Sequence, residues 1–244
     1  MNLEFLFFAN LTLLLRLRWL LVDRPPRALA WWTKMAIEAG ALLMFLRLDV
    51  AGLGAVASSV AINIAAILCD RRARDRNAVH LLLGMVHLLA LSFWLGPAFS
   101  VDFRAGFIGF MQELPDWSAL GLPVAQILEP RFHVFLLGLL LAANEANLLI
   151  RSLLGRLQFR PDTNAGIDAN ELARGRVIGL LERTLIYFFV LNGQFGAVGF
   201  TLAAKAFTRF KELEKRSFAE YVLIGTLLSS GLAMLIATLA RRVA

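Results

Sequence analysis

Long apolar runs alternate with short polar segments along this chain, and the pattern predicts an all-α, polytopic transmembrane helical bundle. A helix needs about 20 predominantly apolar residues to cross the hydrocarbon core of a bilayer. Four runs of about this length lie in the first 100 residues, at 3–22, 31–48, 50–68 and 78–99. Prolines in the turn at 23–27 separate the first two runs, because proline cannot continue a helix. Trp31, Trp32 and Lys34 open the second run and are typical of an interface anchor.

The second half of the chain predicts four more spans. One covers residues 132–150 and the last covers residues 218–240. Residues 171–216 would make a single helix of about 68 Å, which is far longer than a bilayer requires. We therefore expect a C-terminal helical hairpin that turns at Asn192-Gly193, a dipeptide typical of turns. The total is about eight spans, or seven if residues 3–22 lie in the membrane interface.

We expect the whole chain, residues 1–244, to form a single membrane domain. Its predicted parts are four N-terminal spans (1–100), an external interfacial loop (101–130), a fifth span (131–157), a cytoplasmic loop (158–170) and a C-terminal three-span unit (171–244). Small-residue spacings in the last unit, Gly175-x-x-x-Gly179 and Gly225-x-x-x-Ser229, allow helices to approach closely.

Composition and charge favour a membrane location over nucleic-acid binding. The chain is 59% hydrophobic, with a net charge of +7, whereas a soluble domain is roughly 45–50% apolar. The Arg and Lys residues gather at the ends of apolar runs, where they set topology, and loops rich in them stay cytoplasmic. This rule places the loops at 23–34, 70–76, 151–176 and 205–216 in the cytoplasm and both termini outside, although Arg241 and Arg242 oppose it.

The sequence contains few residues suited to cofactor or enzyme chemistry. Cys69 is the single cysteine, so no intramolecular disulfide can form. His80 and His87 share a helix face but lie about 10.5 Å apart along its axis, and we expect His133 on the opposite side of the membrane from His80. We find no phosphate-binding glycine loop, zinc-protease motif or nucleophile elbow. We therefore expect no metal and no cofactor, and the sequence favours a protein without enzymatic activity.

Ionisable residues inside apolar segments are costly and therefore mark candidate sites. Glu182 lies about ten residues before the hairpin turn and Lys205 about twelve after it, so both sit roughly 15–19 Å from the turn and can face one another. The candidate ligand-binding or gating residues are Glu145, Asn147, Glu182, Arg183, Lys205, Arg209, Glu220, Thr226 and Ser229. Two interpretations stay open: an internal ion-pair network that locks the helices, or a polar site for an anionic or headgroup-bearing ligand.

The run GRVIGLLERTLIYFFVLNGQFGAVGFTLAAKAFTRF, followed by EYVLIGTLLS, resembles the C-terminal signature of an uncharacterised bacterial integral membrane protein family, a domain of unknown function. The resemblance covers Gly175 to Ser229 and implies a multi-pass protein of the bacterial inner (cytoplasmic) membrane, but no activity. Members of this family often carry an H-L-L-A-D-F segment, and here His87-Leu-Leu-Ala-Leu91 lacks the acid. The resemblance over Gly175 to Ser229 rests on Gly179, Glu182, Arg183, Gly193, Gln194, Gly199, Lys205, Arg209, Glu220, Gly225, Thr226 and Ser229.

Three functions are compatible with this sequence. The leading hypothesis is a transport or channel-type protein in which the C-terminal polar cluster is the site or gate, with membrane lipids as partners. The second is a structural or assembly subunit whose loop 101–130 binds a second copy or another membrane protein. The third is an enzyme acting on a lipid headgroup. An open polar cavity would favour the first or third hypothesis, and a closed, fully paired cluster would favour the second.

Overall fold

The regular secondary structure of this protein is helical. The computed structural model describes residues 2–17, 28–70, 73, 75–99, 101–113, 129–156, 169–208 and 216–244. Within these ranges there is no strand, and extended pairing is limited to one isolated bridge between Leu46 and Phe103. The all-α prediction is therefore confirmed for the described part of the chain.

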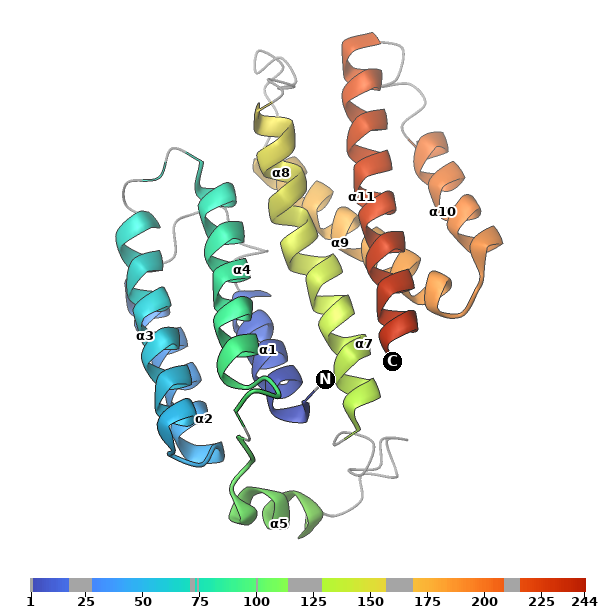
Figure 1. Cartoon of the computed structure of the whole chain (residues 1–244). Coiled ribbons are helices and arrows are strands. Elements are labelled where there is room, and N and C mark those ends of the chain that lie inside the picture. The colour runs from blue at the N-terminus through green and yellow to red at the C-terminus, as the bar shows by residue number, and fades with distance from the viewer. Residues whose placement is uncertain are drawn as a thin grey trace. The chain divides into compact units, whose positions relative to one another are not determined.

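The helices follow the predicted apolar runs (Figure 1). They divide into two compact units, residues 1–137 and 138–243. In chain order the helices are α1 (Leu3–Arg16), α2 (Ala28–Phe45), α3 (Val50–Asp70), α4 (Arg76–Trp94), α5 (Ala105–Glu113), α7 (Pro130–Leu140), the π-helical segment η3 (Leu141–Glu145), α8 (Ala146–Arg156), α9 (Ala169–Leu191), α10 (Phe195–Thr208) and α11 (Arg216–Val243).

In the N-terminal unit, α3 packs against α2 and α4, and α1 packs against α2 and α4. Carboxylates cap two of these helices: Asp49 Oδ1 accepts a bond from Gly52 N at 2.8 Å, and Asp75 Oδ1 accepts one from Ala78 N at 3.1 Å. Such caps satisfy the free N–H groups of a first turn. The apolar core contains Phe8, Leu42, Leu46, Leu91, Leu95, Val101 and Phe103, so the start of the predicted external loop belongs to this core.

The buried and exposed faces of α4 have the polarity expected in a bilayer. His87 and Gly84 are buried, whereas Leu82, Leu89 and Phe93 are exposed. In water, an exposed apolar stripe of this kind would promote association. Lipid is the solvent that matches it, since a bilayer leaves apolar side chains outside and polar groups on the inside of a bundle.

In the C-terminal unit, α9 packs against α11 and η3, and α10 packs against α9. Figure 1 shows α9 running obliquely across α8 and α11, with α10 folding back from its end. The reversal is at Asn192-Gly193, where Gly193 has a φ of 70°. This backbone conformation is costly for residues with a side chain, so the turn is found where the sequence predicts it.

Within the part of the chain that the structure describes, four helices are long and apolar enough to cross a membrane: Val50–Asp70, Arg76–Trp94, Pro130–Arg156 and Val222–Val243. They match the predicted spans at 50–68, 78–99, 132–150 and 218–240 and indicate a membrane protein. The count of about eight spans is not confirmed. Helices α2 and α9 carry charged residues that lower their hydropathy, and the described lengths of α1 and α10 are 14 residues each.

Candidate functional site

The C-terminal hairpin brings Glu182 and Lys205 together. Lys205 Nζ donates to Glu182 Oε2 in an ion pair between α9 and α10. The lysine side chain is 19% exposed and the glutamate side chain 15% exposed. Their similar distances from the turn led us to expect that the two side chains face one another, and the structure contains the contact.

Arg183, next to Glu182, binds the π-helical segment. Its Nε donates to the carbonyl oxygen of Ala142 at 2.9 Å, and its Nη2 donates to that of Ala143 at 3.3 Å. Its Nη1 lies 3.4 Å from Ser229 Oγ. Within the described part of the chain, Arg183 is thus bonded to uncharged oxygens and forms no ion pair. A π segment is an interruption of the helical ladder that often occurs at functional sites, and here a buried guanidinium reaches its carbonyl groups.

A cavity of about 180 Å³ lies beside these cations. Four of the predicted site residues line it: Arg183, Lys205, Thr226 and Ser229. Gly175, Gly179 and Gly225 form part of the wall, so no side chain fills the space there. The rest of the wall is apolar, from Ile150, Leu154, Ile178 and Val222. The site therefore combines two cationic groups and two hydroxyls with an apolar lining.

The other predicted residues that the structure describes do not line this cavity. Glu145 is buried in η3 and accepts a 2.9 Å hydrogen bond from Asn144 Nδ2. Asn147 is half-buried in α8, and Glu220 is exposed near the start of α11. Arg209 lies outside the described residues. The structure thus assembles part of the predicted set around the cavity and leaves Glu145, Asn147, Glu182 and Glu220 out of its lining.

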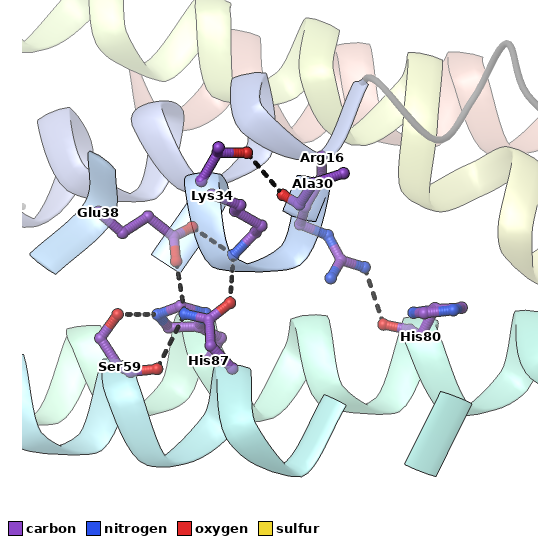
Figure 2. Close-up of polar contacts among 9 residues, drawn as sticks. Arg16, Ala30, Lys34, Glu38, Ser59, His80 and His87 are labelled. Carbon is purple, nitrogen blue, oxygen red and sulfur yellow. Dashed lines mark hydrogen bonds and ion pairs between the residues drawn. The ribbon is translucent and has the colours of Figure 1, made fainter. Parts of the chain in front are cut away.

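The N-terminal unit contains a second polar cluster, which is not among the sites predicted from the sequence. Lys34, Glu38, Asn63, Ser59 and His87 are all buried between α2, α3 and α4. Lys34 differs most from expectation: its side chain is 5% exposed, so it is a buried group and not an interface anchor. Figure 2 shows Lys34 and Glu38 extending from α2 towards Ser59 and His87.

Lys34, Glu38 and Asn63 form a closed triangle of hydrogen bonds. Lys34 Nζ donates to Glu38 Oε1 at 2.5 Å and to Asn63 Oδ1 at 2.8 Å. Asn63 Nδ2 donates to Glu38 Oε2 at 2.6 Å and to the carbonyl oxygen of Ser59 at 2.9 Å. Ser59 Oγ in turn shares a 3.1 Å hydrogen bond with His87 Nε2. Each buried polar group in the triangle is satisfied by the others, as low-dielectric surroundings require.

Further ionisable groups continue from this cluster along the buried face of α4. Arg16 Nη2 donates to the carbonyl oxygen of His80 at 2.8 Å (Figure 2). The guanidinium lies over Gly84, where an added Cβ would come within 2.6 Å of Nη2. His80 Nε2 lies 3.0 Å from Asp70 Oδ1, at the end of α3. Trp31 stacks on the His80 ring at a centroid distance of 5.5 Å.

One sequence signal for the second cluster exists. Lys34 and Glu38 are four residues apart, a spacing that places both side chains on one helix face, and Asn63 interrupts an otherwise apolar run. Because the first of these residues stands close to the predicted end of a span, the pattern alone does not separate an anchor at the membrane surface from a buried ion pair.

Comparison with protein-family models, characterised proteins and solved structures finds no match to this chain. The two polar clusters are therefore the basis for assigning a function to this protein.

Proposed function

We propose that this chain is a multi-pass protein of the bacterial inner membrane, of transport or channel type, whose C-terminal cavity binds a phosphate-bearing anion. The phosphate belongs either to a lipid headgroup or to a soluble ligand. The observation that carries the proposal is the cavity of about 180 Å³ with Arg183 and Lys205 in its wall.

The chemistry of the wall supports this choice of ligand. Arg183 is buried and bonded to neutral oxygens, so its charge is not cancelled by a carboxylate at ion-pair distance among the described residues. A phosphate oxygen would supply that missing charge, since guanidinium groups bind phosphate through parallel N–H donors. Thr226 and Ser229 add hydroxyl donors, and the apolar residues suit the glycerol backbone or acyl chain of a lipid.

A structural role is the alternative, and the Lys205–Glu182 ion pair is the observation that favours it. A pair between two helices can hold a hairpin closed without any ligand. The cavity supports the binding role, because a cluster that only locks helices has no need of an open space beside its cations.

Thermal unfolding of the full chain in phosphatidylcholine nanodiscs tests the proposal. The two additions are inorganic phosphate and, separately, replacement of part of the lipid by phosphatidylglycerol. A ligand present at about 100 times its Kd stabilises the folded state by about 2.7 kcal/mol. Stabilisation by phosphate indicates a soluble anion, and stabilisation by phosphatidylglycerol alone indicates a lipid headgroup.

Variants assign the effect to the cavity. Lys205→Met and Arg183→Lys should both lose it, the second because lysine keeps the charge but not the planar donor fork. Arg241→Gln is the matched control, since it removes an exposed cation from the same unit. Equal stabilisation of all three variants, or none of the wild type, would reject the cavity as the site and favour the structural role.

A further inference from the structure

The Lys34–Glu38 ion pair does not join two helices. Both residues belong to α2, four positions apart, so the pair by itself does not fix α2 against its neighbours. Burying two charges is expensive, and apolar residues of similar volume often replace a buried pair without loss of stability. Helix docking therefore gives a weak reason for an ion pair here, and ionisable groups inside membrane bundles commonly mark a pathway or site.

His87 adds a third titratable group to the same cluster. It comes from α4 and reaches Lys34 and Glu38 through Ser59 and Asn63 of α3. The described ionisable groups around Glu38 are Lys34 on its own helix, Arg16 from α1 and His87 from α4, with Asp70 and His80 further along. Glu38 thus lies in a buried cluster of ionisable groups that come from three helices.

The unit is polar at one end and apolar at the other. Along the buried face of α4, His80, Gly84 with its overlying Arg16, and His87 are followed by Leu91 and Leu95. Along α2, the buried residues Lys34 and Glu38 are followed by Leu42 and Leu46. Helix α3 shows the same order from its C-terminal to its N-terminal end, where Asn63 and Ser59 are followed by Ala55 and Ala51. All three helices thus change from polar to apolar at one level, just beyond Glu38.

The buried polar groups of this unit form a row that ends at Glu38. Polar groups lead from Asp70 and His80, at the end of the unit, to Glu38, and an apolar core closes the other end. A proton that enters at the polar end would meet Glu38 as the last buried ionisable side chain of α2, α3 and α4 before the core.

We propose that Glu38 is the proton acceptor of a proton-binding centre in the N-terminal unit, which Lys34, Asn63, Ser59 and His87 complete and which is reached from the end marked by Asp70 and His80. In the binding step a hydronium ion transfers its proton to a Glu38 carboxylate oxygen: one O–H bond breaks in hydronium, one forms on Glu38, and water is released. The neutral carboxyl no longer attracts Lys34, whose flexible stem lets the ammonium move towards the polar end. The centre is separate from the anion cavity and goes beyond the function proposed above.

Infrared difference spectroscopy of the full chain in nanodiscs tests this proposal, with buffer stepped from neutral to acidic pH. The expected result is a new carbonyl band of a carboxylic acid shielded from water, at a higher frequency than the bands of exposed carboxylic acids, that shifts when the protein is labelled with ¹³C-glutamate. Glu38→Gln should abolish the band. Glu145→Gln, which removes another buried glutamate, should retain it, and so should the exposed-site variant Asp102→Asn.

Two outcomes would overturn the proposal. One is a wild-type spectrum without a glutamate band, and the other is a band that survives in Glu38→Gln. If Glu38→Gln does not fold, the ¹³C-glutamate spectra of wild type and Glu145→Gln decide: a band present in wild type and lost in Glu145→Gln rejects Glu38, and a band in both supports it. None of these results depends on anion binding, so the two proposals can fail separately.

Discussion

The two units of this protein bury charge in different ways. In the N-terminal unit, Lys34 and Glu38 are 5% and 2% exposed and are held with Asn63 in a closed triangle. In the C-terminal unit, Arg183 is also buried, but its partners are carbonyl and hydroxyl oxygens and an open cavity lies beside it. The first cluster is complete without a ligand of molecular size, so we assign it a proton. The second has cationic groups beside open space, so we assign it an anion.

The difference between the two clusters predicts that Lys34→Met causes the largest loss in the free energy of unfolding. This change leaves the Glu38 carboxylate without its cation in a dry, buried position, which typically costs about 3–5 kcal/mol. The measurement is the free energy of unfolding in a detergent or bilayer system where unfolding is reversible. The double variant Lys34→Met/Glu38→Leu removes both charges and should recover most of this loss. A double variant as unstable as the single one would mean that the charges are not the source of the cost.

A smaller loss is expected for Arg183→Met. The substitution strips the Ala142 and Ala143 carbonyl oxygens of a charged donor but leaves no buried charge behind, so we expect about 1–3 kcal/mol in the same unfolding measurement. The same variant should also lose the stabilisation by phosphate that we expect for the wild type. A loss as large as that of Lys34→Met would contradict the difference between the clusters, because it would imply an ion pair at Arg183.

The sequence predicts the helices and part of the C-terminal site for clear physical reasons. In the described part of the chain, apolar runs identify four membrane-length helices, and the Asn192-Gly193 turn gives Glu182 and Lys205 similar depths, which lets them face one another. The other predicted spans lack this support. In α2 the reason is physical: Lys34 and Glu38 lower its hydropathy, yet both are accommodated inside the bundle.

The rest of the site depends on three-dimensional features. The π segment η3 and its contact with Arg183 join residues about 40 positions apart, and no local pattern encodes that contact. The cavity exists because glycines from α9 and α11 meet at one place. The sequence predicts Lys34 to be an interface anchor because hydropathy does not reveal which face of a helix is buried.

A matched pair of glycine substitutions compares the space beside the N-terminal cluster, which side chains fill, with the space beside the C-terminal cluster, which is open. Gly84→Leu should displace the Arg16 guanidinium, which already occupies the space over Gly84, and overpacking of this kind costs about 1–3 kcal/mol. Gly225→Leu should change stability little, since the nearest atom to an added Cβ is Leu154 Cδ1 at 3.7 Å and the cavity takes up the rest. Unfolding free energies of both variants check this, and the reverse order would contradict the assignment of open space to the C-terminal unit.

The same Gly225→Leu variant should lose anion binding, because its side chain occupies the cavity while both cations remain. Thermal unfolding with and without phosphate or phosphatidylglycerol measures this effect. Binding that survives in Gly225→Leu would place the ligand elsewhere.

A cryo-EM map of the full chain in nanodiscs that contain phosphatidylglycerol tests the central claim most directly. We expect density of phosphate size in the cavity, in contact with Arg183 and Lys205, in the wild type, and no such density in Gly225→Leu. A wild-type map in which side chains close the cavity around the Lys205–Glu182 pair, with no ligand density, would contradict the account and make the C-terminal cluster a structural lock.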